Sequence, residues 1–564
     1  MGSLVRVLTF LSRRSGSYRP SRGALATVVL AGMISGAASA GFIALINTII
    51  KSGNHRPAAL AWTFVALCLA LPVFRFLASF LLLRLSNRAV MELRLELSRG
   101  ILSAPLRKLE ELGAPRLLAS LTDDVGALVG AVSATPTLVI QITIVLGCLL
   151  YLGWLSWSLL LLVVLTAAVG VATYELPMLK AQRYFGKSRR DWDHLFQHFR
   201  SLTQGTKELK IHRARRDAFV RESLQGASES LMRNSISGSV IYDAVNSWGQ
   251  ALFFVLIGVV LFVLPQVRPV DQATLTGYTL AILFMVTPLD TILHSLPTLG
   301  RASVAIGRIE ELSRTLAPEA QDGGAAAPPA PWKSLQLMGV THAYHRENED
   351  EVFALGPIDL TLRPGELVFL VGGNGSGKTT LAKLLIGLYA PEEGRVLLDG
   401  EPVRDGNLES YRQMFSVVFS DFYLFESLLG LGEVALDERA RHYLAQLHLD
   451  RKVKVTNGSL STLDLSQGQR KRLALLTAYL EDRPIYLFDE WAADQDPSFK
   501  EVFYRQILPD LKRRGKTVVV ISHDDRYFPV ADRIIKLADG RIATGELAEL
   551  AATSYEIELS EVNV

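Results

Sequence analysis

The stretch that decides the fold is Leu367-Val-Phe-Leu-Val371, followed directly by Gly372-Gly-Asn-Gly-Ser-Gly-Lys-Thr379. The apolar run predicts a buried strand, and a helical pattern continues from Thr380 to Gly387. Strand, glycine-rich turn and helix in this order are the context that a P-loop requires. Glycines let backbone amides turn toward phosphate oxygens, and the helix N-terminus adds a favourable dipole. We therefore predict an ATP-binding loop at residues 372–379.

Two side chains of this loop have predicted chemical roles. Lys378 is expected to neutralise phosphate charge, and the Thr379 hydroxyl is expected to ligate Mg²⁺. The remaining predicted nucleotide contacts of the segment are Gly372, Asn374, Gly375, Ser376, Gly377 and Thr380. ATP and Mg²⁺ are thus the predicted ligands.

A second apolar run, Pro484–Phe488, ends in the carboxylates Asp489 and Glu490, about 110 residues beyond the P-loop. A carboxylate at the end of a strand beside a P-loop suits a second Mg²⁺ contact, which we assign to Asp489. Glu490 is then placed to polarise the water that attacks the γ-phosphate. Together with the P-loop, the pair predicts a hydrolytic site.

The first 300 or so of the 564 residues hold most of the chain's apolar content, and the hydrophobic fraction is 49% overall. Segments of about 20 or more apolar residues are long enough to cross a bilayer. Six such spans are predicted, at about 24–50, 57–83, 130–154, 157–179, 239–265 and 272–299. The first span follows basic residues and could be taken for a signal peptide. At about 27 residues, however, it is longer than a signal h-region and indicates a retained helix.

Charge predicts the orientation of these spans. The N-terminal arm and the two long connections, about 84–129 and 180–238, carry nearly all the Lys and Arg of this part of the chain, whereas the short connections hold only Lys51, Arg56 and Arg268. The positive-inside rule therefore places the long loops and both chain ends in the cytoplasm. The net charge of +3 gives no indication of a nucleic-acid partner. Both cysteines, Cys68 and Cys148, lie in apolar runs and are expected to be buried thiols.

The long loops are expected to do more than connect spans. Ala89–Leu112 and much of Ala181–Leu224 have the pattern of amphipathic helices, with turns near Gly113 and Gly205. Such helices are either solvated surface or docking elements, and the adjacent soluble domain favours docking. Residues 316–332 are rich in Pro, Ala and Gly, which is typical of a linker. The predicted organisation is a transmembrane domain at 1–315, this linker, and a nucleotide-binding domain at 333–564.

Between the two phosphate motifs lies Leu465-Ser466-Gln467-Gly468-Gln469, which leads into a helix. This segment resembles the signature of ABC ATPases, and six spans followed by one such domain resemble an ABC exporter half-molecule over essentially the whole chain. The resemblance implies an α-helical polytopic membrane domain plus an α/β P-loop ATPase domain. It also implies a homodimer, in which Ser466, Gln467, Gly468 and Gln469 complete the partner's nucleotide site.

The same resemblance assigns three further positions. Tyr344 matches the aromatic residue that stacks on adenine, and His523 matches the switch histidine that contacts the γ-phosphate. Asp496 matches the D-loop aspartate that couples the two sites. The catalytic set is then Glu490, His523 and Lys378.

Two segments depart from the family pattern. Ser420 stands where the family usually has a glutamine that bridges Mg²⁺ to the membrane domain, and Asp421 follows it. Ser420 is therefore a candidate Mg²⁺ contact beside Thr379 and Asp489, but because a serine is shorter than a glutamine, a bridging water or Asp421 is expected to make the connection in its place. Val453–Leu463 lacks the usual Gly-Glu pattern that touches the coupling helices.

The motifs around Asp421, Lys471 and Trp491 resemble one branch of the family, the bacterial cyclic-peptide exporters, which include syringomycin-type and pyoverdine-precursor transporters. Export of a cyclic or nonribosomal peptide, such as a siderophore precursor, across the inner membrane is therefore the expected function. A lipid or drug flippase and an ATP-gated channel are the alternatives. Charged residues inside the spans are either cargo contacts or structural partners of one another; they are Arg75, Glu175, Asp243, Asp290 and His294.

Overall fold

The computed structural model describes residues 22–51, 58–267, 270–316, 331–344, 353–431 and 435–543. The chain divides into two compact units. The membrane unit lies within Met1–Ser98 and Arg116–Leu312, and the ATPase unit within Arg99–Pro115 and Ser313–Val564. Most of the predicted linker, like the basic N-terminal arm before Arg22, lies outside the described residues.

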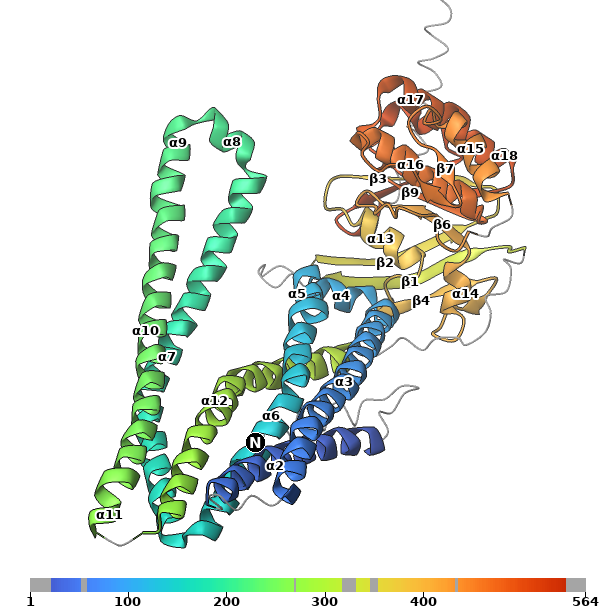
Figure 1. Ribbon diagram of the computed structural model, residues 1–564. Helices are drawn as coiled ribbons and strands as arrows, with labels where there is room; N and C mark the ends of the chain where they lie inside the picture. Colours follow the sequence, from blue (N-terminus) through green and yellow to red (C-terminus); the bar gives the residue numbers. More distant parts are fainter. Residues whose placement is uncertain are drawn as a thin grey trace, which may run out of the picture. The chain divides into compact units, whose positions relative to one another are not determined.

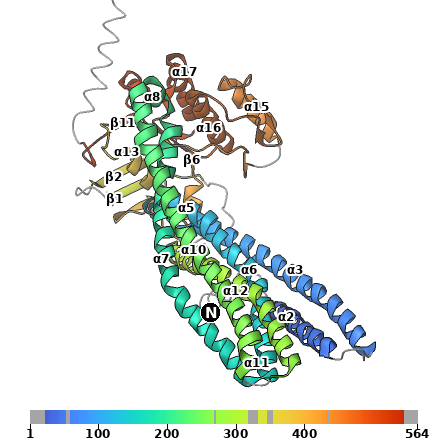
Figure 2. The same cartoon turned by 60° about the vertical axis from the view of Figure 1, so that its left-hand side comes forward.

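Six helices of the described chain are long and apolar enough to cross a membrane, which confirms the six predicted spans. The spans lie in α2 (Arg22–Lys51), α3 (Ala58–Ser103), α6 (Val125–Leu155), α7 (Trp157–Gln204), α10 (Gly226–Gly258) and α12 (Gln272–Thr315). A π-helical turn at Val259–Val263 and the short helix α11 (Leu264–Val267) continue α10. Figures 1 and 2 show α7 and α10 side by side as one long antiparallel pair. The short helices α8 (Thr206–Ile211) and α9 (Arg213–Ala218), followed by a π-helical turn at Phe219–Gln225, join them after the predicted break at Gly205.

Small residues bring α2 and α6 close together. A Cβ at Gly36 would lie 2.5 Å from the Thr143 Cβ, and one at Gly147 would lie 2.6 Å from the Ala40 Cβ. Close backbone approach at glycine and alanine is a common way for membrane helices to associate, because lipid offers no hydrophobic driving force between them. These glycines therefore set the separation of the two helices.

The ATPase unit contains two larger sheets. The antiparallel sheet has the order β2-β1-β4-β5, and the other has the order β12-β11-β3-β10-β9-β6, with every pairing parallel except that of the edge strand β12. The strands are β1 (Leu335–Tyr344), β2 (Phe353–Leu362), β3 (Leu367–Gly372), β4 (Glu393–Leu398), β5 (Glu401–Pro402), β6 (Phe415–Val418), β9 (Ile485–Asp489), β10 (Thr517–Ile521), β11 (Arg533–Ala538) and β12 (Arg541–Ile542). A small hairpin, β7 (Val455–Thr456) with β8 (Ser459–Leu460), occupies the segment that lacks the family pattern.

Helices pack on both faces of the parallel sheet. They are α13 (Lys378–Leu385), α14 (Leu408–Arg412), α15 (Leu436–Gln446), α16 (Gln467–Glu481), α17 (Pro497–Val502) and α18 (Leu508–Arg513). Alternate residues of β3 enter different cores: Phe369 lies in one cluster, and Val368 and Leu370 lie in the other. This two-residue alternation within a continuous apolar run is what a strand covered on both faces requires. The observed architecture confirms the predicted fold class.

The first long loop differs from the prediction in one respect. The expectation of a continuous helix over Ala89–Leu112 is wrong, because α3 ends at Ser103 and α4 (Leu106–Leu112) starts after Pro105. Proline cannot donate a helical hydrogen bond, and it disfavours helical conformation in the residue before it. Gly113, with φ of 74°, then separates α4 from α5 (Ala114–Ala119).

Helix α4 belongs to the ATPase unit and packs against its surface. Leu106 contacts the core that contains β1 and α13. Glu110 forms an ion pair with Lys383 at 2.7 Å, and Arg107 pairs with Glu392 at 2.8 Å. The hydrogen bond and the charge of Arg107 hold the pKa of Glu392 below its usual range. These contacts favour the docking interpretation of the first loop over a purely solvated one.

Candidate nucleotide-binding site

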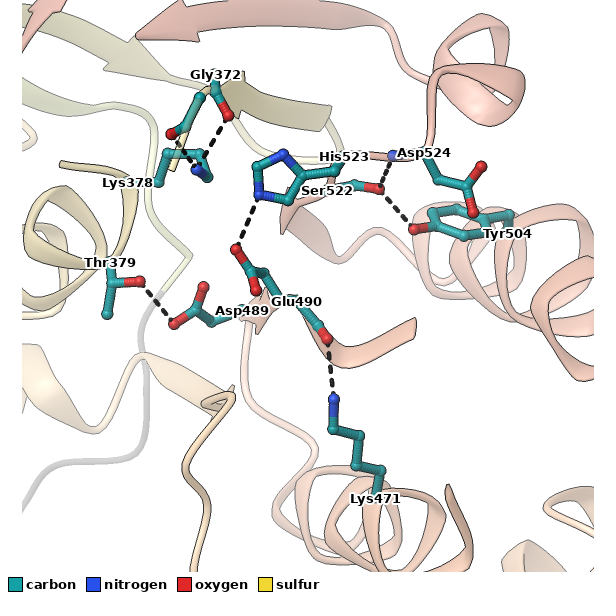
Figure 3. A network of polar contacts seen from close by, with 11 residues as sticks. Gly372, Lys378, Thr379, Lys471, Asp489, Glu490, Tyr504, Ser522, His523 and Asp524 are labelled. Carbon is teal, nitrogen blue, oxygen red and sulfur yellow. Dashed lines mark hydrogen bonds and ion pairs between the residues drawn. The ribbon is translucent and has the colours of Figure 1, made fainter. Parts of the chain in front are cut away.

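Three neighbouring parallel strands carry the candidate site at their carboxyl ends. In the order β3-β10-β9, they lead into the glycine-rich loop, His523 and Asp489-Glu490 respectively. Carboxyl ends of parallel strands meet at one edge of a sheet, so segments far apart in sequence converge there. Figure 3 shows the resulting network of side chains.

The glycine-rich loop wraps around the Lys378 side chain. Its ammonium group donates to the backbone oxygens of Gly372 at 3.1 Å and Gly373 at 2.9 Å. Gly377 has φ of 96°, and a Cβ there would lie 2.8 Å from Leu355 Cδ1, so only glycine fits this position. Burial lowers the pKa of Lys378, while the charges of Glu490 and Asp489 oppose that effect.

Asp489 lies next to the start of α13. Its Oδ2 accepts a hydrogen bond from the Thr379 hydroxyl at 3.1 Å. Burial raises the pKa of Asp489, the charges of Glu490 and Asp421 add to the effect, and the Thr379 hydrogen bond and Lys378 oppose it. Asp489 Oδ1 and Ser376 Oγ are buried without a hydrogen-bond partner among the described residues. One hydroxyl and one under-coordinated carboxylate fit the oxygen donors that Mg²⁺ takes beside phosphates.

Glu490 lies one residue further on and contacts His523. The distance from His523 Nε2 to Glu490 Oε1 is 3.0 Å. Glu490 has φ of 50°, a conformation that non-glycine residues rarely adopt, and its amide donates to the Ile521 carbonyl at 3.1 Å. The side chain of His523 is 43% exposed and that of Glu490 is 35% exposed, so both can reach a nucleotide and a water molecule.

Lys471, on α16, is a part of the site that sequence reasoning missed. Its side chain is only 3% exposed, and its ammonium lies 2.7 Å from Asp494 Oδ2 and 3.1 Å from the Glu490 carbonyl oxygen. A signal was available, because positions 471, 474, 475 and 478 share the buried face of the helix at intervals of three and four residues. A lysine on such a face needs a buried acceptor.

The signature segment lies at the start of α16. Ser466 and Gln469 form a reciprocal capping box there. A Cβ at Gly468 would lie 2.9 Å from the Asp494 carbonyl, and Gln495 Nε2 donates to the Gly468 carbonyl at 3.0 Å. Among the described residues, no hydrogen bond or ion pair joins Ser466–Gln469 to the glycine-rich loop of the same chain.

Asp496 caps α17 by accepting from the Phe499 amide at 2.9 Å. It also pairs with Arg472 of α16, whose Nε donates to Gln495 at 2.9 Å. The predicted D-loop aspartate is thus tied to the signature helix of its own chain. Asn374, Gly375 and Thr380 lie in or just after the loop and are at least partly exposed.

Two predicted positions lie at the edges of the site. Tyr344 is the last residue of β1 and pairs in register with Phe353 of β2. The Phe353 ring lies against Gly377, an aromatic contact to the loop that the sequence did not indicate. Ser420 and Asp421 follow β6 and are both exposed, and Asp421 acts on the site through its charge.

The charged residues within the spans fall into three groups. His294 Nε2 of α12 lies 3.2 Å from Asp290 Oδ1 of the same helix, and the His294 ring also forms a hydrogen bond with Tyr242 of α10. Glu175 and Asp243 are exposed on α7 and α10. Arg75 of α3 lines a cavity.

A P-loop unit with an acid and histidine at its strand ends, in one chain with six membrane-spanning helices, defines an ATP-driven membrane transporter. Residues 355–493 match the family described as ABC transporter, and residues 23–286 match the ABC transporter transmembrane region. The ATP-binding protein SyrD of Pseudomonas syringae pv. syringae is 40% identical, over 92% of this chain and 93% of that protein. The ATP-dependent lipid A-core flippase of Burkholderia orbicola is 26% identical, over 95% and 92% respectively.

A solved structure has the same fold. It is described as a bacterial Atm1-family ABC exporter with ATP bound, and it matches with a TM-score of 0.72, 19% identity and 98% coverage of both chains. The chain belongs to the ABC transporter family and is an ATP-hydrolysing ABC exporter half-transporter. It is accordingly a multi-pass membrane protein that binds ATP.

Proposed function

We propose that this exporter carries a cyclic or nonribosomal peptide, such as a siderophore precursor, across the bacterial inner membrane as a homodimer. The observation that carries the proposal is the 40% identity to SyrD over almost the whole length of both chains. The branch resemblance in the motifs around Asp421, Lys471 and Trp491 supports the same cargo class. The lipid A-core flippases match at lower identity and make lipid export the second candidate.

The geometry of the site supports a role for each residue in hydrolysis. Thr379 and Asp489 would hold Mg²⁺, which supplies charge neutralisation on the β- and γ-phosphates when it is bound. Lys378 would contact the same phosphates once its ammonium turns from the carbonyl oxygens of Gly372 and Gly373. Tyr344 would stack on the adenine at the other end of the nucleotide.

Glu490 would accept a proton from the water that attacks the γ-phosphorus, while the bond from that phosphorus to the β–γ bridging oxygen breaks. His523, in contact with Glu490 Oε1 at 3.0 Å, would orient this carboxylate and bond to a γ-phosphate oxygen. The departure at Ser420 would be compensated by Asp421, whose charge helps to raise the pKa of Asp489. We propose that Asp421, beside Ser420, or a bridging water makes the connection that the family's glutamine makes at position 420.

The signature residues support a dimer. Ser466 and Gln467 are exposed, and within the part of the chain that the structure describes no hydrogen bond or ion pair joins them to their own P-loop. In a C2 pair the same surface serves both subunits, so each signature would close the partner's site and both sites would be equivalent. ATP binding would hold the ATPase units together, and hydrolysis would release them. The cationic long loops support a cytoplasmic position for both chain ends.

Two experiments test the proposal. In nanodiscs, Glu490→Gln should reduce steady-state ATP hydrolysis by about 100-fold or more, since a general base contributes roughly 10²–10⁴-fold. Unchanged hydrolysis would refute the assignment of Glu490.

Cargo is tested in inverted vesicles by ATP-dependent uptake of a cyclic lipopeptide, a lipid A precursor and a hydrophobic amine. The Glu490→Gln vesicles serve as the control. Uptake of the peptide alone supports the proposal. Uptake of the lipid or the amine without uptake of the peptide would refute peptide export and support the flippase function.

A further inference from the structure

The membrane unit contains a cavity of about 560 Å³ whose wall is partly polar. It is bounded by α2, α3, α6 and α12, and its polar lining residues are Ser35, Ser39, Arg75, Gln141 and Thr287. Pockets that bury small ligands have volumes of roughly 300–1,000 Å³. The cavity is therefore large enough for one end of a peptide, and the remaining walls, which include Ile140, Ile144 and Phe284, are apolar.

Arg75 is the charged residue of this lining, and it lies within the span Ala58–Leu81. Among the described residues, no side chain forms an ion pair or a hydrogen bond with it. An arginine at membrane depth is costly unless an anion or a polar cavity compensates its charge. The described part of the membrane unit supplies the polar cavity but no anion paired with Arg75, so a bound ligand can supply that anion.

The cavity also offers hydrogen-bond acceptors. Gln141 Oε1 is buried without a partner among the described residues. Pro72 and Pro288 both line the cavity from within helices, and neither can donate to the carbonyl oxygen four residues earlier, at Cys68 and Phe284. Unpaired backbone in a membrane is tolerated where it lines a cavity or finds another partner. Arg75 and Gln141 thus bring a donor side chain and an acceptor side chain to the lining of one cavity.

We propose that this cavity binds an amphiphile with a free carboxylate next to an amide, the group found at the end of an acylated amino acid or a linear peptide tail. The Arg75 guanidinium pairs with the carboxylate through two parallel hydrogen bonds, a geometry that suits arginine. Gln141 Oε1, which is buried, accepts from the neighbouring amide N–H once the side chain turns toward the cavity, and the apolar walls take the hydrocarbon part. The proposal rests on the proposed peptide export and names the chemical feature of the cargo that the membrane unit recognises.

The test uses a dansylated N-acyl dipeptide in two forms, the free acid and the carboxamide. Both are titrated into the full-length protein in phosphatidylcholine nanodiscs without nucleotide, and the signal from empty nanodiscs is subtracted. The wild-type protein should bind the acid about tenfold more tightly than the amide, since a charged pair of this kind supplies at least one factor of ten. Arg75→Gln should abolish that preference. Arg84→Gln, a cation of the same helix outside the cavity lining, should keep it.

Several results would overturn the proposal. They are equal binding of acid and amide by the wild type, no binding of either form, or an acid preference that survives Arg75→Gln. Equal binding would mean that another carboxylate, such as one from a second subunit, already neutralises Arg75. The wild-type comparison stands even if Arg75→Gln does not fold. Gln141→Leu then gives a second check, because it should weaken the binding of the acid and of the carboxamide equally, by a few-fold.

Further measurements distinguish a lipid phosphate from a peptide carboxylate as the bound anion. They also test the cavity and the proposed peptide export separately. If phosphatidylglycerol in the nanodiscs displaces the acid from the wild type, a lipid phosphate occupies the cavity and the peptide source is overturned. If the acid binds through Arg75 but is neither transported nor stimulates ATP hydrolysis, the binding site stands and peptide export fails. If both forms are exported equally, peptide export stands and the role of Arg75 fails.

Discussion

Replacing the buried lysine of the signature helix, Lys471→Met, should slow hydrolysis without weakening ATP binding. Methionine has a similar length and removes the ammonium. The ion pair lost to Asp494 counts for no more than about 1 kcal/mol, because that carboxylate is 48% exposed and water can solvate it. The larger loss is the charged hydrogen bond to the Glu490 carbonyl, worth about 1.5–3 kcal/mol. The Ala493 amide, at 3.2 Å from the same oxygen, retains part of the constraint.

A net loss of about 2 kcal/mol in the positioning of Glu490 corresponds to a fall of about 30-fold in kcat, at 1.36 kcal/mol per factor of ten. KM for ATP should change by less than about twofold, because Lys471 bonds to Asp494 and the Glu490 carbonyl and, among the described residues, to none of the glycine-rich loop. The assay is steady-state phosphate release from the nanodisc-embedded protein across ATP concentrations. Arg513→Met, which removes a cation with a 76% exposed side chain from α18, is the matched control.

A positioning role for Lys471 is contradicted if Lys471→Met keeps the wild-type kcat, or if KM rises as much as kcat falls. The first result would mean that the Ala493 amide and the strand end hold Glu490 without the ammonium. The second would mean that Lys471 acts on nucleotide binding. A milder effect of Asp494→Asn is expected, since an amide oxygen still accepts from Lys471 and the Glu490 carbonyl keeps its donor.

Three further predictions concern parts outside the hydrolytic site. Glu110→Lys should lower ATPase activity by placing like charges beside Lys383, and the added Lys383→Glu should restore it; a double variant no better than the single one would contradict this ion pair. Burial and then the charge of Arg107 lower the pKa of His342, so the unfolded chain takes up this proton first and stability should fall as pH drops below about 6.5. His342→Phe should flatten the Tm between pH 7.5 and 5.5, and an unchanged slope would place the effect elsewhere. Gly147→Leu should destabilise the membrane unit by about 1–3 kcal/mol through overpacking, whereas Gly41→Leu, which meets no atom within 4 Å, should leave the Tm unchanged.

The elements that local pattern determines were predictable. An apolar run of about 20 residues has few alternatives to a membrane helix, because every backbone group must be satisfied within it. The strand that ends at Gly372 was equally clear, since continuous apolar residues before a glycine-rich loop suit a strand covered on both faces. The end of α3 was not predicted because the amphipathic pattern continues past Pro105. That pattern was given more weight than the helix-breaking effect of the proline.

Contacts between distant segments were not predictable in the same way. Glu110 and Lys383 are 273 residues apart, and neither lies in a motif that indicates the other. Lys471 looked like an ordinary basic residue after a signature sequence, although its helical phase with Ala474 and Leu475 places it on a buried face. Which acceptor meets a buried ammonium depends on the packing of the whole unit.

The P-loop motif at Gly372–Thr379, with its strand and helix, was determined by the sequence alone, because glycine spacing, lysine and hydroxyl act within one turn of chain. The six spans were determined for a similar reason, since hydrophobic length is a local property. Only the tertiary structure decided three other features. His523 contacts Glu490, Lys471 bonds to the Glu490 carbonyl, and Arg75 lines a cavity. Each of these contacts requires strands or helices that are remote in sequence to pack side by side, and their order and separation come from the burial of the whole core.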